Sequence, residues 1–129
     1  MHVPRRFPRL VFDTPAEVEV TAPVAQRRLR RSVRVPATIR SLSCEGAGLQ
    51  LGLGAATLNL IAGASVMLRF TAEESQLELP GLVAWCHTSK GEQHVGVRLQ
   101  LELARAFARH TYATWIVALT RARMQPPGR

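Results

Sequence analysis

The sequence of 129 residues has little cysteine, since it contains only Cys44 and Cys86. Two cysteines cannot build a framework of several disulfides, and neither stands in the Cys-x-x-Cys spacing that is typical of zinc sites. The first nine residues also lack the apolar run of a secretory signal. These absences argue against a disulfide-rich secreted scaffold and favour a reducing, cytoplasmic setting.

Long apolar runs are absent too. Residues 46–68 carry no charge, but five glycines, Gln50, Asn59 and Ser65 interrupt this stretch. A transmembrane helix needs about 20 predominantly apolar residues in a row, whereas such interruptions are typical of strands and turns. We therefore expect no membrane span.

Lysine is almost missing, because 16 of the 17 basic residues are arginine. With only nine acidic residues, the net charge is +8 at pH 7. The planar guanidinium of arginine can bind a phosphate or the guanine edge with two hydrogen bonds at once. The charge favours an anionic partner, while the preference for arginine over lysine can also arise from genome composition.

No set of residues suits catalysis. Paired carboxylates in a motif for acid–base chemistry are lacking, and the Gly-x-Gly pairs do not stand between a strand and a helix, as a dinucleotide-binding motif requires. Cys86 and His87 are adjacent in an expected strand, so their side chains point to opposite faces. A zinc site built from His87 and His94 across a hairpin is the alternative. We expect no enzyme, no metal and no cofactor.

Six segments alternate between apolar and polar side chains, which is the period of a β-strand. Turn-forming residues separate the segments, and short strands at this spacing favour an antiparallel barrel or sandwich. The segments are residues 15–21, 33–40, 47–53, 65–71, 77–86 and 94–101.

From Glu102 to Arg123 the period changes to that of an amphipathic helix, which Pro126-Pro127-Gly128 ends. Its apolar face must be buried, and we expect it to pack on the barrel, with a partner protein as the alternative. The residues expected on this face are Ala104, Phe107, Ala108, Tyr112, Trp115, Ile116 and Leu119. The expected fold is therefore all-β with a C-terminal helix.

Two basic segments flank the first expected strand. Residues 1–12 carry Arg5, Arg6 and Arg9 beside prolines, with too little apolar content for an element, so we expect a flexible basic arm. Residues 27–34 hold five more arginines, which we interpret as a solvated loop, with a nucleic-acid or acidic-lipid patch as the alternative. The expected organisation is the arm at 1–12, a barrel at 13–101, the helix at 102–123 and a disordered tail at 124–129.

A turn rich in small residues runs from Ser41 to Gly48, between two expected strands. Ser41 and Ser43 are two positions apart, so their hydroxyls can point the same way from an extended backbone. Gly46 and Gly48 can adopt positive φ, and successive N–H groups in such a turn form an anion site. An ordinary hairpin turn is the alternative, because serine and glycine are common there.

An ordered set of motifs resembles the PilZ domain family. Arg5-Arg6-Phe7-Pro8-Arg9 is similar to the family pattern Arg-x-x-x-Arg, and Ser41-Leu42-Ser43-Cys44-Glu45-Gly46 is similar to Asp/Asn-x-Ser-x-x-Gly. Residues 81–85 and 95–99 extend the resemblance to about residue 101. It implies a six-stranded antiparallel β-barrel that binds the bacterial second messenger cyclic di-GMP.

The resemblance also implies roles for individual residues. The paired arginines would bind guanine edges and phosphates, Ser43 would hydrogen-bond a phosphate or a guanine, and Gly46 would leave room for the ligand. Trp85 would contact the nucleotide, although we favour a core position for this tryptophan. The implied ligand-binding set is Arg5, Arg9, Ser41, Ser43 and Gly46, with Arg6 and Trp85 as secondary contacts.

Ser41 departs from the family pattern, which has Asp or Asn at this position. A carboxylate can accept hydrogen bonds from both N1–H and N2–H of guanine, whereas a hydroxyl accepts only part of that pattern. The loss of a good bidentate contact costs about 1–3 kcal/mol, or about ten- to a hundredfold in affinity. We therefore expect weakened binding.

Three functions follow from these observations. The first is a non-catalytic cyclic di-GMP receptor whose arm folds over the barrel on binding and so signals to a bacterial protein partner of the motility, pilus or exopolysaccharide machinery. The second is a PilZ-fold adaptor that acts only through protein contacts. The third is a small basic barrel that binds nucleic acid, which we disfavour because the aromatic residues are expected in the core and not on a stacking platform.

Overall fold

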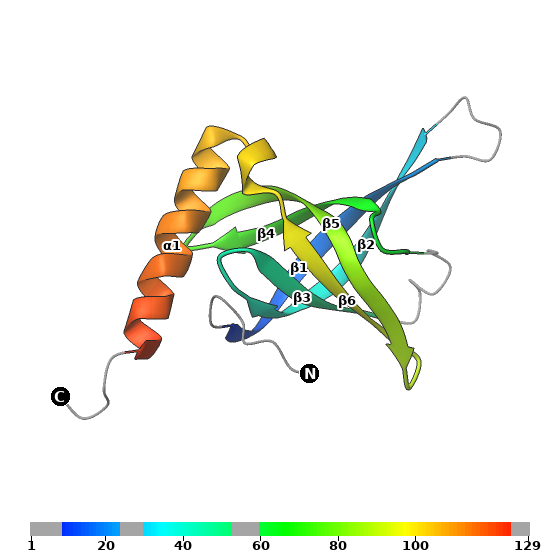
Figure 1. Cartoon of the computed structure of the whole chain (residues 1–129), viewed down its shortest axis with the longest axis horizontal. Helices are drawn as coiled ribbons and strands as arrows, with labels where there is room; N and C mark the ends of the chain where they lie inside the picture. Colours follow the sequence, from blue (N-terminus) through cyan, green and yellow to red (C-terminus); the bar gives the residue numbers. More distant parts are fainter. Residues whose placement is uncertain (1–8, 24–29, 53–59, 125–129) are drawn as a thin grey trace.

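The computed structural model describes residues 9–23, 30–52 and 60–124. Within these ranges, six antiparallel strands close into a barrel in the order β1-β2-β3-β6-β5-β4, and one α-helix lies beside it (Figure 1). The elements are β1 (Leu10–Pro23), β2 (Arg30–Leu42), β3 (Gly46–Leu51), β4 (Ser65–Ala72), β5 (Ser75–Ser89), β6 (Glu92–Leu99), the short 3-10 helix η2 (Leu101–Leu103) and α1 (Ala106–Met124). The all-β barrel with a C-terminal helix that the sequence predicts is confirmed.

The barrel interior is filled by every second side chain of the strands. In β4 the side chains of Val66, Leu68 and Phe70 are buried, and in β5 those of Leu77 and Leu79 are buried in the same way. Successive side chains of a strand point to opposite faces, so the alternation in the sequence directly selects the residues that form the core.

The helix α1 packs on the barrel through one face. Ala108, Tyr112 and Ile116 are spaced by four residues, are buried, and belong to the same hydrophobic cluster as the barrel residues. The ring of Tyr112 meets that of Phe70 edge to face, with 6.3 Å between the ring centroids. The predicted packing of the helix on the barrel is therefore confirmed.

Phe107 does not belong to this buried face. The prediction that it does is wrong, because its side chain is 66% exposed. One helical residue turns the chain by about 100°, which separates Phe107 from its buried neighbour Ala108. The helix also begins at Ala106, since residues 101–103 form η2 first. None of the helices in the described ranges has the length and apolarity needed to cross a membrane.

The barrel begins earlier than the sequence predicts. β1 starts at Leu10, so residues 10–12, which are expected in the basic arm, belong to a strand that pairs with β2. Arg9 immediately precedes this strand. The other expected arm residues, Arg5 and Arg6, lie outside the described residues, as do residues 125–129 of the expected tail.

Part of the second basic run is also strand. The pairing between β1 and β2 continues as far as Pro23 and Arg30, so Arg30, Arg31 and Arg34 are in β2 and not in a loop. Residues 24–29, with the remaining arginines of this run, lie outside the described residues.

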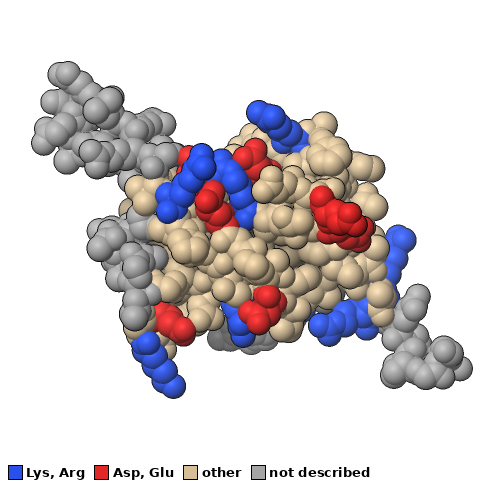
Figure 2. Space-filling model, turned by 180° about the vertical axis from the view of Figure 1, so that it is seen from behind, with Lys and Arg blue, Asp and Glu red and all other residues tan. Residues whose placement is uncertain are grey.

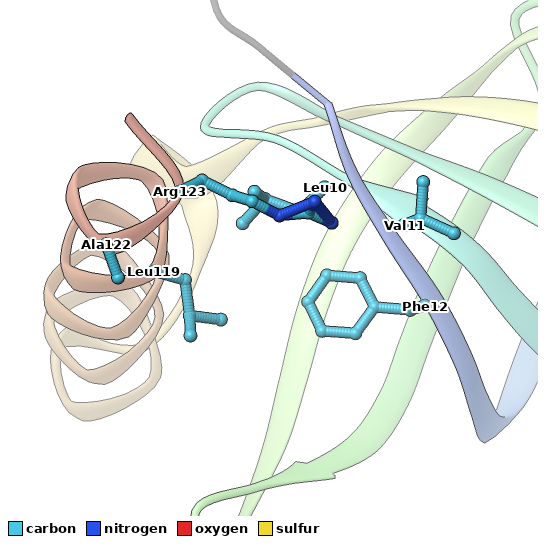
Figure 3. Close-up of a pocket in the computed structure, with 6 residues that line it drawn as sticks. All are labelled: Leu10, Val11, Phe12, Leu119, Ala122 and Arg123. Atoms are coloured by element: carbon cyan, nitrogen blue, oxygen red, sulfur yellow. The ribbon is translucent and has the colours of Figure 1, made fainter. Parts of the chain in front are cut away.

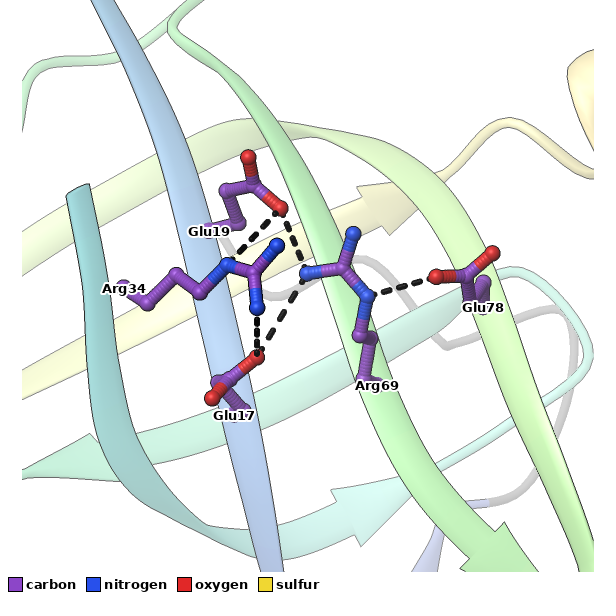
Figure 4. Close-up of polar contacts among 5 residues, drawn as sticks. All are labelled: Glu17, Glu19, Arg34, Arg69 and Glu78. Atoms are coloured by element: carbon purple, nitrogen blue, oxygen red, sulfur yellow. Dashed lines mark hydrogen bonds and ion pairs between the residues drawn. The ribbon is translucent and has the colours of Figure 1, made fainter. Parts of the chain in front are cut away.

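Charged side chains form a network on the outer surface of β1, β2, β4 and β5 (Figure 4). Arg69 lies 2.6 Å from Glu19 and 2.6 Å from Glu78, and Arg34 lies 3.5 Å from Glu19. Figure 2 shows acidic and basic side chains interspersed over one whole face of the molecule. Part of the positive charge of the arginines is therefore balanced by glutamates on the barrel surface.

Candidate functional site

The turn between β2 and β3 is shorter than the sequence predicts. Ser41 lies in β2 and Gly46 in β3, and the Ser43 Oγ accepts hydrogen bonds from the N–H groups of Glu45 (3.3 Å) and Gly46 (3.1 Å). Among the described glycines, positive φ occurs at Gly63 and Gly91. The predicted positive φ at Gly46 and Gly48 is therefore wrong, because both are extended strand residues.

The surface beside this turn has a floor of two paired glycines. Gly48 of β3 lies directly opposite Gly96 of β6. A Cβ atom on Gly48 would lie 2.5 Å from the Ser41 Oγ and 4.0 Å from a guanidinium nitrogen of Arg9, and a Cβ atom on Gly96 would collide with the indole of Trp85. Gly48 thus leaves room for the Ser41 hydroxyl, and Gly96 allows the indole of Trp85 to lie against the sheet.

A pocket of about 400 Å³ opens at this place. Ligand pockets in proteins have volumes of about 300–1,000 Å³. The residues that line it and bear on function are Arg9, Ser43, Glu45, Gly46, Trp85 and Arg98. We call this space the Arg9 pocket. It joins the residue before β1, the β2–β3 turn and the strands β5 and β6.

The Arg9 pocket brings together four of the residues that the sequence singles out: Arg9, Ser43, Gly46 and Trp85. Ser41 does not line it, because its hydroxyl lies over Gly48. Two backbone N–H groups already bind the lone pairs of the Ser43 Oγ, so its hydroxyl hydrogen is the group left for a ligand. Ser43 can therefore donate a hydrogen bond but is poorly placed to accept one.

Trp85 is a surface residue. The core position that the sequence favours is wrong, because the side chain is 42% exposed. A register shift between Val83 and Trp85 in the pairing of β5 with β6 accounts for this difference. Such a bulge inserts an extra residue and thereby changes which side chains face outward.

Trp85 is the first of three rings that stack in a row along the barrel surface. Its ring lies 5.7 Å from that of His87, and His87 lies 5.2 Å from His94, with planes 20° apart in the second pair. Imidazole lone pairs lie in the ring plane, so two nearly parallel rings do not direct them at one ion. In the part of the chain that the structure describes, no group of three metal-ligating residues occurs.

Two charged residues of the pocket are missing from the ligand-binding set that the sequence implies. Arg98 pairs with Gly46 across β3 and β6, and its side chain is exposed. Glu45 stands in the turn, and its side chain is exposed as well. The motif counts Glu45 as an unspecified position, and only the register of β6 brings Arg98 beside the turn.

Cys44 lies next to the pocket but is not activated. Burial, and to a smaller extent the charge of Glu45, raises the pKa of the Cys44 thiol. A nucleophilic cysteine needs a lowered pKa, because the thiolate is the reactive form. The thiol therefore stays protonated at neutral pH.

A second cavity, of about 300 Å³, lies between the start of β1 and the end of α1 (Figure 3). Phe12 and Leu119 point toward one another from the two elements, and Arg123 extends from α1 toward the start of β1 (Figure 3). Leu10, Val11, Phe12, Leu119, Ala122 and Arg123 line this space, which we call the β1–α1 groove. Leu10 follows Arg9 in the chain, so the groove begins one residue from the Arg9 pocket.

Comparisons with known proteins match this architecture. The family model described as PilZ domain matches residues 4–113. The chain resembles the Bacillus subtilis inhibitor of motility MotI/DgrA, with a TM-score of 0.61, 14% identity, and coverage of 96% of this chain and 55% of that one. For the PilZ domain with c-di-GMP of YcgR from Escherichia coli, the TM-score is 0.60 at 13% identity, with coverage of 92% and 93%.

The PilZ domain of CeSA from a cellulose synthesizing bacterium gives a TM-score of 0.56 at 15% identity, with coverage of 92% of this chain and 99% of that one. At such identities the likeness concerns the fold. The chain spans about half the length of MotI/DgrA. No curated protein matches this sequence significantly.

Proposed function

Because this chain belongs to the PilZ domain family, we propose that it is a non-catalytic receptor for cyclic di-GMP that signals to a protein partner. One observation carries the proposal. Arg9, Ser43 and Gly46, which come from both family motifs, line one pocket together with the exposed Trp85.

The groups of the Arg9 pocket complement the chemistry of the ligand. Cyclic di-GMP carries two phosphates and two guanines, and guanine presents N7 and O6 to a bidentate arginine. Arg9 and Arg98 offer two guanidinium groups for these sites. The Ser43 hydroxyl donates to a phosphate oxygen, and stacking of a base on an aromatic ring such as Trp85 contributes about 1–3 kcal/mol.

The signal to the partner passes through β1. Arg9 holds the ligand at one end of this strand, and the next three residues line the β1–α1 groove. A ligand that fixes Arg9 therefore changes the surface formed by β1 and α1. The partner is a protein of the bacterial motility, pilus or exopolysaccharide machinery, and the receptor acts in the cytoplasm. MotI/DgrA, which this chain resembles in fold, is named an inhibitor of motility.

The alternative is a PilZ-fold adaptor with weak or no nucleotide binding. It is favoured by Ser41, which replaces the acidic or amide residue of the family motif and lies over Gly48 outside the pocket lining. An adaptor would retain the fold and the partner, while changes at Arg9 would have no effect in any ligand assay.

Titration calorimetry with cyclic di-GMP decides between these functions. The receptor predicts saturable heat that GTP and a single-stranded oligonucleotide do not reproduce. No heat at a high micromolar ligand concentration would reject it and leave the adaptor. Salt-sensitive binding of the oligonucleotide would instead indicate the nucleic-acid function, for which the exposed Trp85 offers a stacking surface.

A further inference from the structure

We infer that Glu45 determines base specificity, because its carboxylate accepts the N1–H and N2–H groups of a guanine in the Arg9 pocket. The inference rests on the proposed function. It assigns to Glu45 the hydrogen bonds that the family's acidic or amide residue could make and that Ser41 cannot make in full.

The backbone of Glu45 is held in place while its side chain remains exposed. The Glu45 N–H donates to the Ser43 Oγ at 3.3 Å, and its carbonyl oxygen accepts a hydrogen bond from the N–H of Leu99 at 2.9 Å. These two bonds tie the turn to itself and to the end of β6. The side chain therefore projects from a fixed point on the pocket wall.

Ser41 is poorly placed for the same task. Its Oγ would lie 2.5 Å from a Cβ atom on Gly48, so the hydroxyl occupies the space above that glycine. Among the residues that the structure describes, Glu45 supplies the carboxylate of the Arg9 pocket.

The charge balance of the pocket allows an anionic acceptor beside an anionic ligand. Arg9 and Arg98 line the same space and bring two positive charges against the single negative charge of Glu45. The guanidinium groups attract the phosphates, and the carboxylate meets the edge of a base where donors are exposed. One pocket thus offers cationic donors to the phosphates and an anionic acceptor to the base.

Three cyclic dinucleotides that differ in their bases test whether Glu45 contacts the base edge. Guanine presents two donors, N1–H and N2–H, to a carboxylate. Hypoxanthine, in cyclic di-IMP, retains N1–H but lacks the exocyclic amine, and adenine, in cyclic di-AMP, presents an acceptor at N1. Affinity should therefore fall in the order of the guanine, hypoxanthine and adenine ligands.

The experiment measures the affinities of all three ligands by calorimetry for the unchanged protein, Glu45→Gln, Glu45→Ala and the control Glu102→Gln. Glu102 is an exposed acid of η2 outside the pocket. We expect Glu45→Ala to weaken cyclic di-GMP binding about 10- to 100-fold, the range of one bidentate base contact, and to bring the ratio between cyclic di-GMP and cyclic di-IMP close to one. Glu45→Gln should weaken binding less, because its amide oxygen can still accept a hydrogen bond from the base. Glu102→Gln should leave that ratio unchanged.

The outcomes separate the inference from the proposed function. If the unchanged protein binds cyclic di-GMP and both Glu45 variants keep the same ratio between cyclic di-GMP and cyclic di-IMP, the inference is overturned and the receptor function stands. If the unchanged protein binds none of the ligands, the receptor function itself fails. Equal binding of cyclic di-GMP and cyclic di-IMP by the unchanged protein overturns the inference without any variant.

Discussion

The hydroxyl of Tyr112 donates a hydrogen bond of 2.6 Å to the backbone carbonyl oxygen of Ser43. Tyr112 lies in α1 and is fully buried, whereas Ser43 belongs to the turn that lines the Arg9 pocket. The bond therefore connects the C-terminal helix to the candidate ligand site, which are 69 residues apart in sequence. The helix therefore stabilises the turn at the candidate site as well as the core.

Tyr112→Phe removes this bond and leaves the ring in place. We expect the free energy of unfolding to fall by about 1–3 kcal/mol, because a buried carbonyl loses its partner. Urea unfolding measures the change. Thr120→Val is the matched control, since its hydroxyl bonds to Ile116 within α1 and its loss should cost less than about 0.5 kcal/mol. Equal effects of the two changes would contradict the assigned role of Tyr112.

Tyr112 also predicts how stability changes at alkaline pH. It is the single tyrosine of the chain, and burial, with a smaller contribution from Cys44, raises the pKa of its hydroxyl in the folded state. The phenol of the unfolded chain ionises at about pH 10, so the contribution of Tyr112 to the free energy of unfolding is fully present below that pH. Above it the stability falls, by up to about 1.4 kcal/mol per pH unit.

Urea unfolding of the unchanged protein and Tyr112→Phe between about pH 9 and pH 11 isolates this contribution, because other groups titrate in both proteins. The difference in unfolding free energy should shrink as the pH rises. Tyrosinate absorbance should appear only with unfolding. A constant difference between the two proteins would contradict the raised pKa.

Gly96→Ala tests whether the position of Trp85 matters for the ligand. The new Cβ atom would collide with the indole, so Trp85 must leave its place beside the pocket. We expect cyclic di-GMP affinity to fall about tenfold or more, in line with the loss of one stacked base. Calorimetry measures the affinity, and circular dichroism checks the fold.

Gly52→Ala is the matched control, because a Cβ atom at Gly52 meets no atom within 4 Å. This variant should bind as the unchanged protein does. A Gly96→Ala protein with full affinity would show that Trp85 does not contact the ligand.

Arg9→Ala tests the family arginine that the structure describes. We expect cyclic di-GMP binding to fall below detection in calorimetry, because a bidentate contact to phosphate or guanine is lost and no other side chain replaces its geometry. Arg109→Ala is the control: Arg109 is exposed on α1 and does not line the Arg9 pocket. Arg5→Ala should likewise abolish binding, as the motif predicts. Unchanged affinity in Arg9→Ala would favour the adaptor.

Local periodicity was sufficient to predict the strands and the helix, while the choice of a six-stranded barrel over a sandwich came from the family resemblance. Alternation with period two selects one face of a strand, and spacing by three and four selects one face of a helix. Val66, Leu68 and Phe70 in β4, and Ala108, Tyr112 and Ile116 in α1, are buried for this reason. The prediction failed at Trp85, because a bulge changes the alternation and no local signal marks where a bulge will form.

The motifs predicted Arg9, Ser43 and Gly46 as candidate site residues, and the structure places all three in one pocket. They could not indicate a role for Arg98 or Glu45, and Ser41, which they also include, is not among the residues that line this pocket.

The sequence by itself therefore determined which side chains face inward and which short segments carry polar groups, since both depend on neighbours along the chain. Only the tertiary structure decided which of these groups meet. The register of β3 against β6 sets Gly48 opposite Gly96 and Gly46 opposite Arg98, and the pairing of Leu10 with Leu42 brings the start of β1 beside the same turn. Strand register and closure arise from packing between segments distant in sequence, so no local pattern contains them.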